Sequence, residues 1–92
     1  MMDTLRIRLS ELRSKEYLSS TPTQRATWLQ LLLYCEEHNT QGVIDNAWKW
    51  TDRTWNMVCK ITGEEVRQEC DLFAWENGHL YVWPHENLTG GA

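Results

Sequence analysis

The 92-residue sequence predicts a single small α+β domain. Three observations predict this class: a capped apolar helix begins near Thr21, two further helices follow in close succession, and a tight hairpin is centred on Asn77-Gly78. The apolar fraction of 41% and the charged fraction of 24% are those of a globular protein. Six tryptophans bring a large burial area to this short chain. We expect one domain over residues 1–87 and a flexible tail over residues 88–92.

The first predicted element is a strand over residues 5–9, where apolar and basic residues alternate. As a strand, this segment would turn Leu5, Ile7 and Leu9 toward the core, and its arginines toward solvent. Residues 10–20 are mostly polar with a few apolar anchors. We expect one or two helical turns there.

The first long helix is predicted to begin after Thr21, whose hydroxyl can cap the free amides. Pro22 fits the first helical position, and Gln24 completes a capping box. The helix should run to about His38 and bury a wide apolar face, formed by Ala26, Trp28, Leu29, Leu32, Leu33 and Tyr34. Residues 39–42 should end it, and residues 42–44 read as a short extended segment.

A second helix is predicted after Thr51, with Asp52 in its first turn and with apolar residues at helical spacing, namely Trp55, Val58, Cys59 and Ile61. The preceding link, residues 45–50, has room for an extra turn. Thr62 and Glu65 form another capping box, which starts a third helix with Val66, Cys70 and Phe73 on one face. Two helices joined by so short a turn make a helix-turn-helix candidate.

Asn-Gly between two apolar runs is the strongest short-range signal for a hairpin. With Asn77-Gly78 at the turn, Trp75 faces Leu80 and Phe73 faces Val82 on one side. On the other side, Ala74 faces Tyr81 and Leu72 lies near Trp83. Both faces are apolar, and Pro84 should end the second strand.

A strand, three helices, a short extended segment and a C-terminal hairpin together give the element order of a winged helix. Residues 25–35, Gly42-Val43-Ile44, the helix around Trp55 and the hairpin at 78–83 resemble the N-terminal winged-helix domains of phage and prophage replication proteins, including DnaD-like replisome organisers. The resemblance covers roughly residues 5–83 and implies a role in DNA replication. In DnaD-like proteins this domain associates, and a separate C-terminal domain makes much of the DNA contact.

Charge is unevenly distributed along the chain. Residues 1–30 carry five basic and three acidic side chains, a net +2, whereas residues 31–92 carry four basic and ten acidic ones, a net −6. The predicted third helix carries four carboxylates, which would oppose binding in the groove of a duplex: Glu64, Glu65, Glu69 and Asp71. The nucleic-acid candidates therefore lie mainly in the N-terminal arm, with a few near the third helix and the wing: Arg6, Arg8, Arg13, Lys15, Arg25, Arg67, Gln68 and His79. The alternative is that these side chains only solubilise the surface.

A second hypothesis is a surface for a partner protein or for self-association, because aromatic residues are enriched at interfaces. Its candidates are Trp48, Trp50, Tyr81 and Trp83. The alternative is that residues 5–9 cover Tyr81 and Trp83 within the same molecule. Trp48 and Trp50 cannot both point inward on a helix, so one of them should be exposed.

Sites for catalysis, metal and cofactor are not expected. The sequence has no nucleophile with a matching base and no glycine-rich phosphate loop. Cys35 and His38 have a ligand-like spacing, but no Cys-x-x-Cys pair accompanies them. Three cysteines without a disulfide-like spacing predict reduced thiols in a cytoplasmic protein, and no segment is apolar enough to span a membrane.

The sequence therefore predicts a non-enzymatic winged-helix module of a phage-like DNA-replication or regulatory system. It would bind DNA weakly and without sequence preference through its basic N-terminal arm and its wing. The alternative is a protein-interaction or self-association module without direct DNA binding. A second copy or a replication protein is then the expected partner, and no small-molecule substrate is expected.

Overall fold

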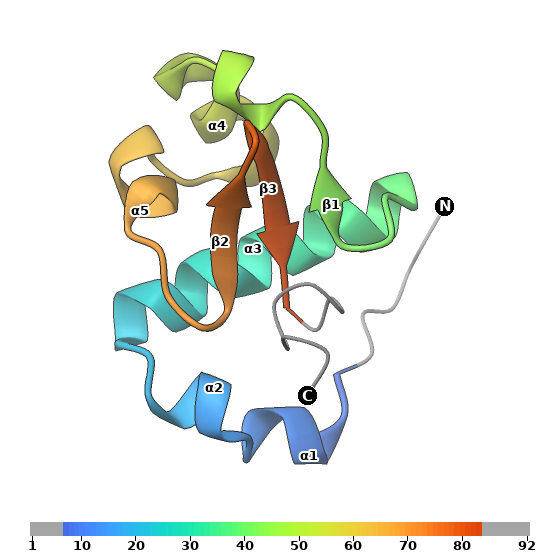
Figure 1. Ribbon diagram of the computed structural model, residues 1–92, viewed down its shortest axis with the longest axis vertical. Helices are drawn as coiled ribbons and strands as arrows, with labels where there is room; N and C mark the ends of the chain where they lie inside the picture. Colours follow the sequence, from blue (N-terminus) through green and yellow to red (C-terminus); the bar gives the residue numbers. More distant parts are fainter. Residues whose placement is uncertain (1–6, 84–92) are drawn as a thin grey trace.

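The computed structural model describes residues 7–83, in which short and long helices surround a three-stranded antiparallel sheet (Figure 1). In chain order the elements are α1 (Leu9–Leu12), α2 (Lys15–Leu18), α3 (Pro22–His38), β1 (Val43–Ile44), the 3-10 helix η1 (Ala47–Lys49), α4 (Asp52–Cys59), α5 (Gly63–Arg67), β2 (Phe73–Glu76) and β3 (His79–Val82). The strand order is β1-β3-β2, and α3 crosses behind the sheet (Figure 1). The predicted α+β class is confirmed.

Helix α3 begins and ends where the sequence predicts. The hydroxyl of Thr21 accepts a hydrogen bond from the Gln24 amide, and the Gln24 side chain accepts one from the Thr21 amide. Asn39 ends the helix in the left-handed conformation, at φ 56°. No helix within residues 7–83 is long and apolar enough to cross a membrane.

The predicted buried face of α3 is wrong in part. The helix buries Thr27, Trp28, Leu31 and Cys35, whereas Leu29 is 41% exposed and Ala26 is also exposed. Apolar residues occur on several sides of this helix, so their spacing defines no single stripe. Its contacts with the sheet, α4 and α5 select the face that is buried.

The core is built around tryptophan rings. The Trp28 indole Nε1 donates a hydrogen bond of 2.8 Å to the carbonyl of Trp83, and the two ring centroids are 6.0 Å apart. Trp55 of α4 is also fully buried, together with Leu31, Phe73 and Leu80. These contacts join α3, α4 and the hairpin into one core.

The hairpin has the predicted register. Phe73 pairs with Val82, Ala74 with Tyr81, and Trp75 with Leu80. Both turn residues have positive φ, 55° at Asn77 and 82° at Gly78, as a type I′ turn requires. The Trp83 amide donates to the Leu72 carbonyl at 2.8 Å, which confirms the predicted proximity of these two residues.

The predicted strand over residues 5–9 is wrong for the part that the structure describes. Leu9 begins helix α1, and residues 7 and 8 belong to no strand. The Arg8 amide donates a 2.9 Å hydrogen bond to the Glu11 carboxylate, so this segment starts a helix instead. Leu5, Arg6, Pro84 and the predicted tail lie outside the described residues. The turns predicted within residues 10–20 are present as α1 and α2.

The predicted third helix is much shorter than expected. It starts at the expected Thr62 capping box, but α5 ends at Arg67 after five residues. Cys70 and Phe73 lie in a β-bridge to each other instead of continuing a helical face. Phe73 also pairs with Val82 in the hairpin. This strand pairing is incompatible with a helix that continues to residue 73, so the helical spacing of Val66, Cys70 and Phe73 is not realised.

The turn of the hairpin is sensitive to added volume. An added Cβ on Gly78 would collide with the Trp48 ring, and its φ of 82° disfavours any L-amino acid with a side chain. We expect Gly78→Ala to lower the free energy of unfolding by about 1–3 kcal/mol, measured by urea denaturation. Asn77→Gly, which keeps the turn conformation, should change it by less than about 1 kcal/mol.

Gly78→Ala in a Trp48→Ala background separates the collision with the indole ring from the strain of the positive φ. Without the indole, only the backbone strain remains, so the penalty of Gly78→Ala should shrink. An equal penalty in both backgrounds would mean that the ring does not restrict this position.

Candidate functional site

A pocket of about 290 Å³ opens between η1, α4, the end of α5 and β2. Four of the six tryptophans line it, and so do one cation and one anion: Trp48, Trp50, Trp55, Trp75, Arg67 and Glu69. We call this the tryptophan pocket.

The rings of the tryptophan pocket pack against one another. Trp55 is 1% exposed and forms its base, with Trp50 at a centroid distance of 4.4 Å and Trp75 edge-on at 6.2 Å. Trp50 is backed in turn by Tyr34 of α3 at 5.4 Å. Trp48 lies at the rim and is 62% exposed. Three of the four rings are thus packed against one another, and the fourth is largely open to solvent.

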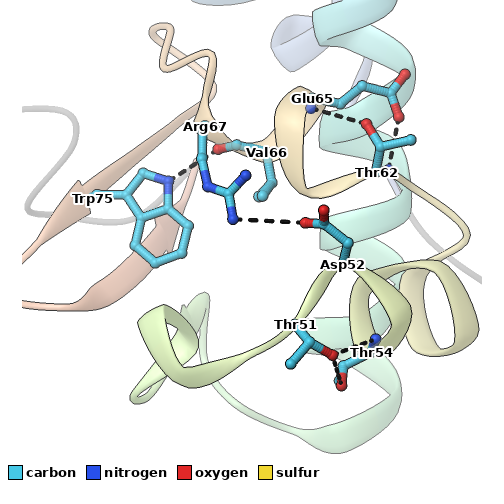
Figure 2. Close-up of polar contacts among 8 residues, drawn as sticks. All are labelled: Thr51, Asp52, Thr54, Thr62, Glu65, Val66, Arg67 and Trp75. Carbon is cyan, nitrogen blue, oxygen red and sulfur yellow. Dashed lines mark hydrogen bonds and ion pairs between the residues drawn. The ribbon is translucent and has the colours of Figure 1, made fainter.

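Hydrogen bonds fix the β2 wall. The Trp75 indole Nε1 donates to the Val66 carbonyl at 2.9 Å, and the Trp75 amide donates to Glu69 Oε2 at 2.6 Å (Figure 2 shows the first). These bonds hold Trp75 against the end of α5. The pocket is therefore formed before any ligand arrives, which lowers the ordering cost of binding.

The charged groups on the lining of the pocket are one cation, Arg67, and one anion, Glu69. Arg67 Nη2 lies 3.6 Å from Asp52 Oδ1 (Figure 2), so a carboxylate already pairs with the cation of the pocket. Both side chains are more than half exposed, at 62% and 75%, so this pair adds little stability. Glu69 uses Oε2 for the Trp75 amide, and its Oε1 accepts no hydrogen bond from residues 7–83.

Helix caps set the positions of the elements around the pocket. The Thr51 hydroxyl accepts from the Thr54 amide at the start of α4, and the Thr62 hydroxyl accepts from the Glu65 amide at the start of α5 (Figure 2). Both caps satisfy amides that would otherwise have no partner. The sequence predicted both helix starts.

Two of the four predicted interaction residues lie at this site. Trp48 and Trp50 line the pocket, and Trp48 is the exposed member of the pair. Trp83 is only 6% exposed and packs on Trp28, so its ring belongs to the core and offers no surface to a partner. Tyr81 is half-buried on β3, where it pairs with Ala74 and Val43.

Sequence reasoning did not assign Trp75 and Glu69 to this site. Trp75 was expected only as a hairpin residue, and Glu69 only as one of the acidic groups of the third helix. The available signal was the crowding of four tryptophans into residues 48–75. Which of these rings meet depends on the contact between β2 and α4, and spacing alone does not reveal it.

The predicted nucleic-acid residues are dispersed. Arg8, Arg13 and Lys15 are exposed around α1 and α2, and Arg6 lies outside the described residues. The hairpin turn lies at the opposite end of the molecule from α1 and α2 (Figure 1). The arm and the wing do not form one continuous surface.

Several of these candidates have structural contacts instead. Arg25 donates to the carbonyls of Tyr17 and Leu18 at 3.0 Å each, and its guanidinium lies 4.8 Å from the centroid of the Tyr17 ring. Its charge is used to hold α2 on α3. His79 Nδ1 accepts a 2.9 Å hydrogen bond from the Asn46 amide, which fastens the link before η1 to the hairpin. Gln68 is exposed at the end of α5.

The cysteines lie in apolar surroundings. Burial raises the pKa of the Cys35 thiol, and burial raises the pKa of Cys59 from 9.0 to about 12. Cys70 is half-buried, and all three thiols are free. Within residues 7–83, no three histidine, cysteine or carboxylate side chains are grouped in a way that could hold a metal ion.

The raised pKa values make a prediction about alkaline pH. Above pH 9 the unfolded chain releases thiol protons that the folded chain keeps, so the free energy of unfolding should fall as pH rises from 9 toward 12. Each such thiol contributes a slope of up to about 1.4 kcal/mol per pH unit. We expect Cys59→Ala to flatten the curve, measured by urea denaturation between those pH values.

Other groups that titrate at alkaline pH are present in both the unmodified chain and the Cys59→Ala variant. The difference between their two curves of unfolding free energy against pH therefore isolates the contribution of Cys59. Parallel curves would contradict a protonated buried thiol. As an independent readout, iodoacetamide should modify the half-buried Cys70 before Cys35 and Cys59, followed by mass spectrometry.

Comparison of the chain with protein-family models, with curated proteins and with solved structures found no match in any of the three. We therefore infer function from the pocket, from the exposed side chains and from the distribution of charge.

Proposed function

We propose that this chain is a non-enzymatic winged-helix module that binds a partner protein through the tryptophan pocket. The observation that carries the proposal is the pocket itself, in which buried and half-buried indoles surround about 290 Å³ and Trp48 stays 62% exposed. Tryptophan is enriched among the residues that dominate binding energy at interfaces. A partner that covered the exposed indole would remove its apolar surface from water.

The winged-helix part of the proposal is supported by topology. The order of the elements is that of a winged helix: α3, β1, α4, α5, β2 and β3. Strand β1 pairs with β3 on the edge that faces away from β2. In such a domain α5 would be the helix that enters a DNA groove. It has only five residues, and carboxylates lie in it and just after it: Glu64, Glu65 and Glu69. This helix is too short and too acidic for groove reading to be the best-supported function.

A replication setting is supported by the sequence resemblance alone. In DnaD-like proteins the N-terminal winged helix is the part that associates. A binding role for the tryptophan pocket agrees with that division of labour. We propose a second copy of the chain or a replication protein as the partner.

Site-specific crosslinking tests the proposal. We expect a photoreactive benzoylphenylalanine at position 48 to crosslink to a partner protein in native extract. The same residue at Glu37, an exposed position on α3, serves as the control. Mass spectrometry of the adduct distinguishes a second copy from another protein. Equal crosslinking at both positions, or none at position 48, would reject the pocket as an interface.

One observation favours nucleic acid as a second candidate. Arg8, Arg13 and Lys15 are exposed around α1 and α2, and no ion pair within residues 7–83 includes them. Such side chains can contact a phosphate backbone without reading sequence. Binding of this kind is weak, independent of sequence and strongly dependent on salt.

Titration with short duplex DNA at low salt tests this candidate. We expect Arg13→Glu to weaken binding and to reduce the slope of log affinity against log salt by about 1. Arg53→Glu makes the same change in net charge at an exposed position of α4 and should have a much smaller effect. If both variants bind alike, or if the unmodified chain does not bind, the cations of α1 and α2 are only a solvated surface.

A further inference from the structure

We infer that the tryptophan pocket takes the cationic end of a lysine or arginine side chain presented by the partner. The inference rests on the proposed protein-binding function and adds the chemistry of the group that is bound. It is carried by three features of the pocket: its size, the faces of its rings and its charge.

The size of the pocket suits a single side chain. Pockets for small organic ligands usually measure about 300–1,000 Å³, so a volume of about 290 Å³ is at the lower limit of that range. The Trp55 base and the Trp50 and Trp75 walls meet at interplanar angles of 43° and 81°. The rings are therefore not parallel, so they do not form a flat stacking platform. One compact group fits this shape better than an extended surface.

Indole faces attract cations. The π-system gives each face a negative potential, and tryptophan is the best of the aromatic side chains in this role. The chain already shows such a contact at the rim, where the Lys49 ammonium lies 5.5 Å from the centroid of the Trp48 ring. A cation entering the pocket would lie beside the exposed Trp48 and near the half-buried Trp50 and Trp75, which also line it.

Charge complements this preference. Arg67 pairs with Asp52 outside the lining, and Glu69 is the carboxylate on the lining itself. Its Oε1 accepts no hydrogen bond from the described residues and can accept one from an ammonium or guanidinium group. The chain beyond residue 30 carries a net charge of −6, so the surroundings of the pocket also favour a positive guest.

The same charge opposes nucleic acid at this site. Bases stack well on tryptophan, and Arg67 could contact one phosphate. A polyphosphate strand would nevertheless have to approach Glu69, Asp52 and the acidic α5. A basic protein segment meets attraction from the rings and from the carboxylates together.

Peptide titration of the intact chain tests the inference. The probes are three capped pentapeptides of glycine and serine that differ at the central residue, which is arginine, lysine or norleucine. Binding is followed through the indole N–H resonances of the protein. We expect the arginine and lysine peptides to shift the resonances of Trp48, Trp50 and Trp75, and the norleucine peptide to bind at least threefold more weakly.

Variants identify the groups responsible. Glu69→Gln keeps an oxygen acceptor for the Trp75 amide but removes the charge, and should weaken binding of the arginine peptide by roughly threefold. Glu64→Gln removes an equal charge from an exposed position outside the pocket lining and should leave affinity nearly unchanged. Trp48→Ala removes an exposed ring and should weaken binding by about threefold or more.

The outcomes separate this inference from the proposed function. Equal binding of the norleucine peptide, or equal effects of Glu69→Gln and Glu64→Gln, would overturn the cationic guest while crosslinking at position 48 still supports a protein interface. Shifts produced by a short oligothymidylate but by no peptide would overturn it in favour of nucleic acid. Absence of crosslinking at position 48 would instead reject the interface itself.

Discussion

The contact between Trp28 and Trp83 is the constraint on which the other contacts depend. It places the end of β3 against the middle of α3 by a 2.8 Å hydrogen bond and by ring packing. Tyr17 packs edge-on against the same Trp28 ring at 5.6 Å, so α2 is located by it as well. Because an indole is large and its N–H needs a partner when buried, this one side chain fixes both distance and orientation. The hairpin, the long helix and the N-terminal turns all take their positions from it.

A second series of aromatic contacts begins at Tyr34 on α3 and continues through Trp50 and Trp55 to Trp75. It connects the long helix to the strand that walls the tryptophan pocket. The rings that line this pocket are therefore also part of the core. Only Trp48 extends beyond this series to the solvent, so the rim is the part that can change with little effect on the fold. Buried tryptophans stabilise the fold, and the exposed tryptophan at the rim is the one available for binding.

The features that depend on near neighbours in the chain were predictable from the sequence. The caps at Thr21, Thr51 and Thr62 and the turn at Asn77-Gly78 each involve side chains and amides within a few residues of one another. The features that depend on distant contacts were not. The length of α5 is decided by the pairing of Phe73 with Val82, and the pocket by the packing of Trp75 on Trp55. The capping residues determine where α5 begins, whereas the strand pairing of β2 limits how far the helix can extend.

The central position of β3 has a consequence for folding during synthesis. It pairs with β1 on one side and β2 on the other, although the ribosome makes it after both. Val43 cannot pair until Tyr81 has been synthesised, and the part of α3 that packs on Trp83 stays uncovered until that residue is made. A nascent chain arrested before this strand would expose its apolar helix and the unpaired edge of β2. Such species are prone to aggregate, so early completion of the β2–β3 hairpin would protect the nascent domain.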